Sequence, residues 1–239
     1  MTGVTAIATR ELGSYFRQPA GWITIALYLF LTGMVFSLYI LSPGEPASMR
    51  MFFALSGWLL LPVVPAISMR LVSDELRSGT IETLLTSPLS GPSLVIGKFM
   101  GGALFLLAML LPTLVFVAVL FRVSEPAPDV GPLISGYSCL ILMGLMYLAI
   151  GTLASSITSN ATLAFMITLF AILGLMFMGE AHTRSPAFLQ PFVYALMIKP
   201  RVDDFAKGVI DSGHVVFFLS GTVWFLVLAV ASVELRRWR

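Results

Sequence analysis

The residues best suited to chemistry lie in one polar stretch, 73–88, between two long apolar segments. Its charged residues are Asp74, Glu75, Arg77 and Glu82, and its apolar residues Ile81, Leu84, Leu85 and Pro88 fall at helical spacing. A short helix with a small apolar stripe and a charged rim is suited to docking into a groove of a soluble protein. The alternative is a helix that lies on the lipid surface without a partner.

Two features give this stretch internal structure. Asp74 and Glu75 stand where acidic side chains favour a helix N-terminus. Gly79 either divides the stretch into two parts or lets another backbone approach closely. The stretch is also far longer than a turn between two apolar segments requires. We therefore expect a structured element here.

Catalytic and metal-binding patterns are absent from the rest of the sequence. Residues 91–98 resemble a phosphate-binding loop, but five residues separate the two glycines and Phe99 replaces the Ser or Thr that would hold Mg²⁺. His182 and His214 are far apart and have no ligand cluster nearby, which favours surface histidines over a metal site. We expect no catalytic residue, no metal and no bound cofactor on this chain.

Composition indicates which solvent surrounds the chain. The 239 residues are 58% hydrophobic and 11% charged, whereas a soluble domain is about a quarter charged. So little polar surface cannot cover a water-soluble globule, and we expect the bilayer to be the solvent. The net charge of +2 is too small to imply a nucleic-acid partner. The single cysteine, Cys139, excludes an internal disulfide.

Six apolar stretches are long enough to cross a membrane as helices of about 20 residues. They are 20–41, 52–72, 97–121, 132–155, 161–179 and 215–233. No Asp, Glu or Lys falls in the central part of any of them, which argues against ion-coupled transport. Gly97 and Gly101 form a GxxxG pair that permits close helix approach. The sequence thus predicts an all-α integral membrane protein with six transmembrane helices in a single domain, 1–239.

The positive charges predict the orientation of these spans. With six spans both termini share one side, and that side carries eight of the 14 Lys and Arg residues. These eight are Arg10, Arg17, Arg70, Arg77, Lys98, Arg236, Arg237 and Arg239. The short loops of the other side carry only Arg50 and Arg122. We expect both termini to be cytoplasmic.

Shorter helices are expected outside the spans. Residues 1–19 place Val4, Ala8, Leu12 and Tyr15 on one face of a helix that ends before proline 19, which predicts an amphipathic helix in the cytoplasmic interface. An unstructured tail is the alternative. In the outer segment 180–214, the apolar run 188–198 is too short to span and fits a re-entrant or surface helix. A second short helix is expected at 203–210.

Three motifs resemble those of ABC-2 type permeases. The first is Asp74-Glu75-x-Arg77-x-Gly79-Thr80-x-Glu82-x-Leu84-Leu85-x-x-Pro88, followed by Gly97-Lys98. The second, Arg10-Glu11-Leu12-x-x-Tyr15-Phe16-x-x-Pro19, resembles the interfacial helix of that family. The third lies ahead of the last span and comprises Phe205, Lys207, Gly208 and Asp211 within 205–211. It resembles the branch of gliding-motility and nitrous-oxide-reductase-maturation permeases.

The resemblance implies a half-transporter of a bacterial inner membrane. In that family the loop corresponding to 73–90 holds the coupling helix, which docks on an ABC ATPase subunit. The residues implied in coupling are Asp74, Glu75, Arg77, Gly79, Thr80, Glu82, Leu84, Leu85 and Pro88. Two permease chains, identical or related, would pair and bind two ATPase subunits, which would hold the ATP and Mg²⁺. The chain itself would then not be an enzyme.

Two other functions remain open at this point. A non-transporting membrane anchor or mechanotransmitter would use the same loop but act on periplasmic partner proteins through the outer segment 180–214. A passive channel would need no docking helix. The sequence names neither the substrate nor its direction of movement.

Overall fold

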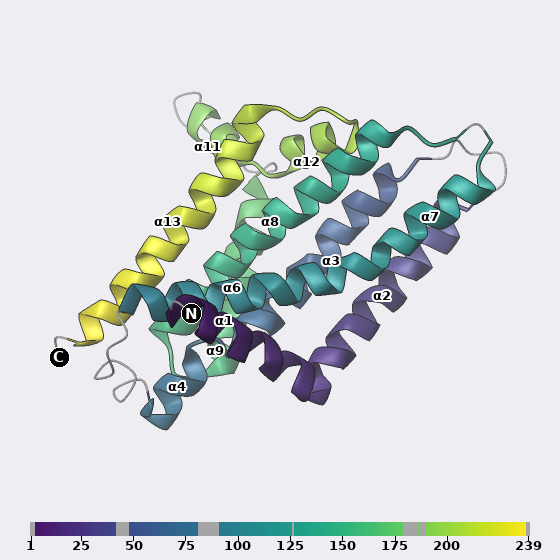
Figure 1. Ribbon diagram of the computed structural model, residues 1–239. Helices are drawn as coiled ribbons and strands as arrows, with labels where there is room; N and C mark the ends of the chain where they lie inside the picture. Colours follow the sequence, from purple (N-terminus) through teal and green to yellow (C-terminus); the bar gives the residue numbers. More distant parts are fainter. Residues whose placement is uncertain are drawn as a thin grey trace.

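In the computed structural model, every regular element among the described residues is a helix (Figure 1). The structure describes residues 3–41, 48–80, 91–125, 127–178, 186 and 190–237, without the side chains of residues 192, 236 and 237. The helices are α1 (Gly3–Arg17), α2 (Pro19–Tyr39), α3 (Arg50–Ser68), α4 (Ser73–Ser78), α6 (Gly91–Leu110), η1 (Leu111–Thr113), α7 (Leu114–Val123), α8 (Val130–Ile157), α9 (Ala161–Met176), α11 (Gln190–Leu196), α12 (Lys199–Ala206) and α13 (Ser212–Arg237).

The helices form a multi-pass membrane protein, as predicted. Five helical stretches among the described residues are long and apolar enough to cross a bilayer: Pro19–Tyr39, Arg50–Ser78, Gly91–Val123, Val130–Ile157 and Ser212–Leu235. The sixth predicted span corresponds to α9, which has 16 residues. At 1.5 Å per residue α9 is about 24 Å long, shorter than the hydrocarbon core of about 30 Å.

Several helix ends differ from the predicted bounds. The span predicted at 52–72 is helical to Ser68 and then turns into α4. The span predicted at 97–121 begins earlier, at Gly91, and is interrupted by η1 at Pro112, since a proline lacks the N–H needed for a regular helix. The outer helix predicted at 203–210 instead runs Lys199–Ala206, because Pro200 suits the first turn of a helix.

The two ends of the bundle carry different short helices (Figure 1). At one end, α1 and α4 lie close to the start of α6; we call this the α4 end. At the opposite end α11 and α12 lie beside the start of α13; we call this the α12 end. The α4 end therefore brings together the N-terminal helix and the polar stretch that the sequence singled out.

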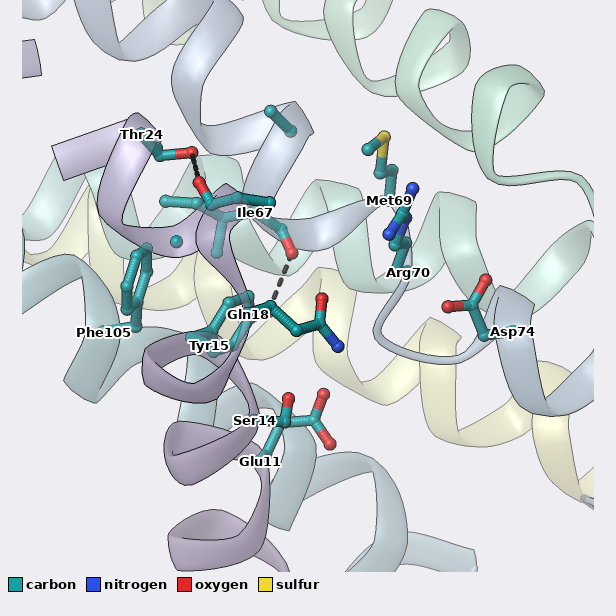
Figure 2. A pocket seen from close by; sticks show the side chains of 13 residues that line it. Glu11, Ser14, Tyr15, Gln18, Thr24, Ile67, Met69, Arg70, Asp74 and Phe105 are labelled. Atoms are coloured by element: carbon teal, nitrogen blue, oxygen red, sulfur yellow. Dashed lines mark hydrogen bonds between the residues drawn. The ribbon is translucent and has the colours of Figure 1, made fainter. Parts of the chain in front are cut away.

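The predicted amphipathic helix is α1, and the structure confirms that it ends before Pro19, at Arg17. Its apolar face packs on protein. Ile7 and Ala8 are buried, and the Tyr15 ring stacks on Phe105 of α6 with ring centroids 4.5 Å apart (Figure 2). The alternative of an unstructured tail is wrong for residues 3–17.

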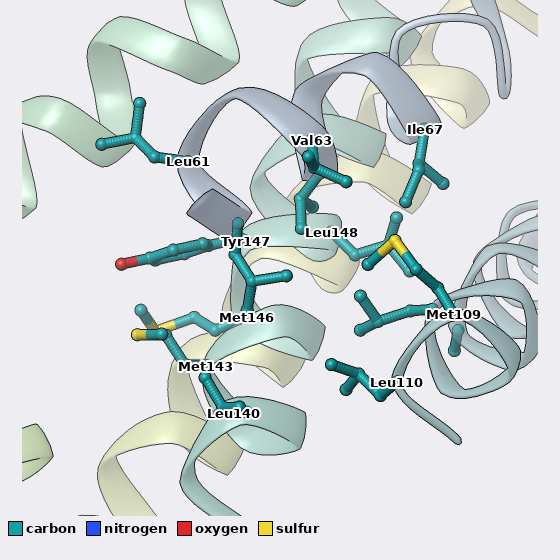
Figure 3. Close-up of a cluster of buried hydrophobic side chains, with 14 of the residues drawn as sticks. Leu61, Val63, Ile67, Met109, Leu110, Leu140, Met143, Met146, Tyr147 and Leu148 are labelled. Atoms are coloured by element: carbon teal, nitrogen blue, oxygen red, sulfur yellow. The ribbon is translucent and has the colours of Figure 1, made fainter. Parts of the chain in front are cut away.

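The core is built around α8, which packs against α3, α6, α9, α12 and α13. Leu140, Met143, Met146, Tyr147 and Leu148 project from α8 among side chains of α3 and α6 (Figure 3). Two α8 glycines permit this close packing: a Cβ on Gly144 would lie 2.7 Å from a Leu106 methyl, and one on Gly136 would overlap the Phe53 ring.

Large apolar side chains also cover the outside of the bundle. Phe30 of α2, Phe170 of α9 and Trp224 of α13 are 68%, 66% and 64% exposed, respectively. Such outward-facing apolar helices are unsuited to water and suited to lipid. We therefore expect lipid, not water, to surround the outer faces of the bundle.

Candidate functional site

The polar stretch that follows α3 begins as a real helix. Asp74 and Glu75 occupy the first turn of α4, as predicted, and Arg77 lies in its last turn. Gly79 ends the helix in a left-handed conformation with φ of 71°. A Cβ at Gly79 would meet nothing within 4 Å. Its backbone conformation, not close packing, therefore requires glycine, which decides between the two predicted roles.

A cluster of four charged side chains fixes α4 to the rest of the α4 end. Lys98 Nζ of α6 lies 3.0 Å from Glu75 Oε1 of α4 and 3.3 Å from Glu11 Oε2 of α1. Arg10 of α1 lies 3.5 Å from the same Glu75 oxygen. We call Arg10, Glu11, Glu75 and Lys98 the charge cluster. It contains two cations and two carboxylates, so it is neutral as a whole.

Burial makes the charge cluster energetically important. The Lys98 side chain is 4% exposed and both carboxylates are 15% exposed, while Arg10 is 58% exposed. A buried ammonium is costly to desolvate and persists only with close partners of opposite charge. Lys98 is thus committed to Glu11 and Glu75, and these contacts tie α6 to α1 and α4 at once.

Small residues on α6 explain why α1 lies over Lys98. A Cβ on Gly97 would lie 2.8 Å from the Ile7 Cβ, and one on Gly101 would lie 2.6 Å from the Glu11 Cβ. The α1 helix therefore packs on the GxxxG pair. Lys98 directly follows Gly97, the first glycine of the pair, so α1 also covers Lys98. The close approach that the sequence permitted is made with the N-terminal helix.

Two hydroxyl groups hold the end of α3 and the turn that follows it. Ser155 Oγ of α8 accepts hydrogen bonds from the backbone N–H groups of Val72 and Ser73, at 2.9 and 3.0 Å. Tyr15 of α1 donates its hydroxyl hydrogen to the Ile67 carbonyl at 2.8 Å. Burial, and to a lesser extent the nearby Glu11, raise the pKa of the Tyr15 phenol above its usual value, so it remains a donor.

These contacts make the α4 end a mechanically connected unit. The charge cluster joins α4 to α1 and α6, Tyr15 joins α1 to α3, and Ser155 joins the α3–α4 turn to α8. A force applied to α4 would therefore act on several spans at once rather than bend a free loop. Rigid elements linked in this way transmit a displacement from one site to another.

The predicted coupling residues have different surroundings in the structure. Asp74, Arg77, Gly79 and Thr80 are exposed, whereas Glu75 points inward to Lys98. The Thr80 hydroxyl lies 2.9 Å from the Ser78 hydroxyl. The other four predicted residues, Glu82, Leu84, Leu85 and Pro88, lie outside the described residues.

The predicted outer residues lie at the α12 end. Phe205 is fully buried and its carbonyl accepts a hydrogen bond from Ser135 of α8 at 2.6 Å. Gly208 has φ of 93°, which glycine adopts readily. Asp211 Oδ1 accepts a hydrogen bond from Gly213 N at 2.8 Å. Lys207 lies 3.6 Å from Asp204, three residues earlier in the chain. Of the four predicted residues, Phe205 thus holds α12 to α8 and Asp211 holds the start of α13.

His214 is not the solitary surface residue that the sequence suggested. Its Nε2 lies 3.1 Å from Asp204 Oδ2. The hydrogen bond from His214 lowers the pKa of the Asp204 carboxyl, and Lys207 contributes in the same direction. Nearby, Arg201 donates to the Ala195 carbonyl and lies over the Phe217 ring at 3.8 Å. Side-chain hydrogen bonds and a cation–π contact thus hold the helices of the α12 end together.

Sequence reasoning missed four residues at the α4 end: Glu11, Tyr15 and Lys98 as partners of the polar stretch, and Ser155 as the hydroxyl that holds its first turn. Lys98 was counted among the charges facing the cytoplasm, but it is buried because α1 covers it. The sequence did contain one signal for the burial of Lys98. Lys98 lies within the GxxxG motif, where another helix can pack over it.

A comparison with protein-family models gives a match over most of the chain. The model described as "ABC-2 family transporter protein" matches residues 5–191, from α1 to the start of α11. It therefore covers the charge cluster and the whole polar stretch. The segment 205–211, on which the resemblance to a particular branch depends, lies beyond the match, so that branch remains a prediction. No curated protein matches the chain.

Proposed function

Because the chain belongs to the ABC-2 family of transporter proteins and so is a membrane component of an ABC transporter, we propose that its α4 end receives the motion of a separate ATPase subunit. The segment 73–90 is the docking element. ATP binding and hydrolysis on the partner displace this segment, and the attached spans move with it to export or shift a substrate across a bacterial inner membrane.

The observation that supports this proposal most directly is the charge cluster. A docking element has to be exposed to its partner and yet fixed to the spans that it moves. In α4 these roles fall on different residues, since Asp74 and Arg77 are exposed and Glu75 pairs with buried Lys98. Coupling requires contacts that differ between two states of the transporter, and a mixed-charge exposed rim can supply them.

The proposed assembly contains two permease chains, identical or related, and two ATPase subunits, which hold the ATP and Mg²⁺. The α4 end and both termini face the cytoplasm. The chain contributes no catalytic residue, so its own variants change ATP turnover only through the docking contact. This property separates a docking role from a catalytic one.

The test uses variants at the exposed rim of α4. Complexes carrying Arg77→Glu or Gly79→Leu are purified from membranes of the native host, and ATP hydrolysis and subunit composition are measured. We expect both variants to insert normally but to lose the ATPase subunit or its coupled turnover. Arg122→Glu, which changes an exposed arginine in the last turn of α7, is the matched control and should behave as wild type. Normal association and turnover in the α4 variants would refute the docking role.

A second candidate is a mechanotransmitter that moves periplasmic partners without transporting a substrate. The α12 end favours it, because α12 packs on α3 and α8 while Asp204 and Lys207 remain exposed. Motion of the spans would then reach a charged outer surface. Asp204→Lys should disrupt such an output while leaving ATP hydrolysis unchanged. If Asp204→Lys changed ATP hydrolysis but not the action on periplasmic partners, the mechanotransmitter role would be excluded.

A further inference from the structure

A pocket of about 160 Å³ lies at the α4 end, between α1, the start of α2 and the α3–α4 turn. Its rim is polar and its floor is apolar. The rim comprises Glu11, Ser14, Gln18, Arg70 and Asp74, and the floor includes Ala66, Ile67, Met69 and Phe105. Figure 2 shows these side chains around one space, with Arg70 and Asp74 on one side and Glu11 and Ser14 on the other.

The rim contains polar groups that the described part of the chain does not use. No hydrogen bond or ion pair joins the side chain of Gln18, Arg70 or Asp74 to another described residue. Glu11 uses Oε2 for Lys98 and contributes a second carboxylate to the rim. The pocket thus presents a guanidinium on the same rim as two carboxylates, with one amide between them. This pattern suits a ligand that itself carries both signs of charge.

The position of the pocket indicates the source of this ligand. α2 begins at Pro19 and α3 ends at Ser68, so the pocket lies at the ends of two spans, where lipid headgroups meet the protein. Ile23 and Leu27 follow the lining residues Ala20 and Thr24 by three positions and hence adjoin them on α2. They are 64% and 52% exposed. An apolar surface therefore continues from the polar rim along the span.

We propose that this pocket binds the phosphoethanolamine headgroup of a membrane lipid. The Arg70 guanidinium binds the phosphate, since its fork of donors fits phosphate oxygens. The primary ammonium donates to the carboxylates of Glu11 and Asp74. The acyl chains lie on the exposed face of α2. A trimethylammonium headgroup has no N–H to donate, and a glycerol headgroup has no cation, so both fit this rim less well.

The bound headgroup would touch three elements, and the charge cluster connects two of them, α1 and α4. Glu11 belongs to α1, Arg70 to the α3–α4 turn and Asp74 to α4. Lipid composition would then affect how firmly α1 is held against α4. The inference concerns the chain alone and needs no ATPase subunit, so it can fail or hold independently of the docking role.

The experiment compares three lipids with identical acyl chains: phosphatidylethanolamine, phosphatidylcholine and phosphatidylglycerol. The purified full-length chain is incubated in detergent with each lipid over a concentration series, and bound lipid is counted by native mass spectrometry. For wild type we expect an apparent affinity for phosphatidylethanolamine about tenfold above that for phosphatidylcholine, which corresponds to ~1.4 kcal/mol. Equal affinity for the three lipids would overturn the proposal.

Variants of two exposed pocket residues test whether the lipid binding depends on the pocket. Asp74→Asn should reduce the preference for phosphatidylethanolamine at least about threefold, since it removes one charged acceptor. Arg70→Gln should weaken the binding of phosphatidylethanolamine and phosphatidylcholine alike. Arg77→Gln removes an exposed cation that does not line the pocket and should leave the affinities for the three lipids unchanged. An undiminished preference in Asp74→Asn contradicts the proposal.

A competition experiment with soluble phosphoethanolamine distinguishes a lipid ligand from a free metabolite. Phosphoethanolamine in solution should displace bound phosphatidylethanolamine only at concentrations far above those of the lipid, because it lacks the acyl chains that contact α2. Displacement at equal concentration would show that the ligand is the soluble compound and would overturn the assignment to a lipid.

Discussion

Replacing Lys98 by methionine removes the ammonium group from the charge cluster and keeps the length of the side chain. The ammonium lies 3.0 Å from Glu75 and 3.3 Å from Glu11, and the side chain is 4% exposed. Without it the two carboxylates, each 15% exposed, lose their common partner. Glu75 keeps Arg10 at 3.5 Å, and Glu11 keeps no partner within the charge cluster.

The size of the loss follows from this geometry. Removing one member of a buried ion pair costs about 3–5 kcal/mol. Water reaches both carboxylates in part, and Arg10 can still neutralise one of them, so we expect Lys98→Met to lower the free energy of unfolding by about 2 kcal/mol. The α1 helix should detach first, because Glu11 is then left without its partner.

The assay is a double-mutant cycle in mixed detergent micelles. The free energy of unfolding is measured for wild type, Lys98→Met, Glu75→Gln and the double variant. We expect an interaction energy of at least about 1 kcal/mol between the two sites. If the two single losses add to within about 0.5 kcal/mol, the side chains do not interact and the reasoning about the charge cluster is wrong.

The remaining predictions concern packing, hydrogen bonding and pH. Gly101→Leu should release α1 from α6 and increase its cleavage by protease, because a Cβ at this position would lie 2.6 Å from an α1 side chain; Gly174→Leu, where a Cβ meets nothing within 4 Å, should not. Ser155→Ala should cost about 1–3 kcal/mol in thermal and chemical unfolding, since two buried N–H groups lose their acceptor, whereas Ser138→Ala, on an exposed face, should cost less than about 0.5 kcal/mol. A hydrogen bond from an imidazole lowers the pKa of Asp204, so the stabilisation it gives is complete above pH of about 4 and is lost as the pH falls through its lower folded value. The difference in melting temperature between wild type and Asp204→Asn should accordingly be present at about pH 6 and shrink below about pH 4.

The sequence predicted the helical membrane fold well because hydropathy and helix-breaking residues carry that information locally. Pro19 marks the boundary between α1 and α2, and Asp74 and Glu75 mark the first turn of α4. Local patterns are less informative about helix ends that depend on contacts with other helices. The α3–α4 turn is held by Ser155, which lies more than 80 residues away in the chain, and hydropathy contains no signal for that contact.

The charge cluster shows the same limit more clearly. A single lysine near the end of an apolar run looks like a residue that extends its side chain to the membrane surface. Whether Lys98 does so depends on what covers it, and the covering helix is α1, which precedes it by more than 80 residues. Gly97 and Gly101 indicated that a helix could pack there without indicating which one.

The most direct test of the docking role is site-specific crosslinking in native membranes. A photoreactive group attached at Arg77→Cys, in a chain with Cys139→Ala, is activated with and without ATP, and the captured protein is identified by mass spectrometry. The account predicts capture of an ATP-hydrolysing subunit from position 77 and no such capture from a matched group at Arg122→Cys. Capture of that subunit only from position 122, or from neither position, would contradict it.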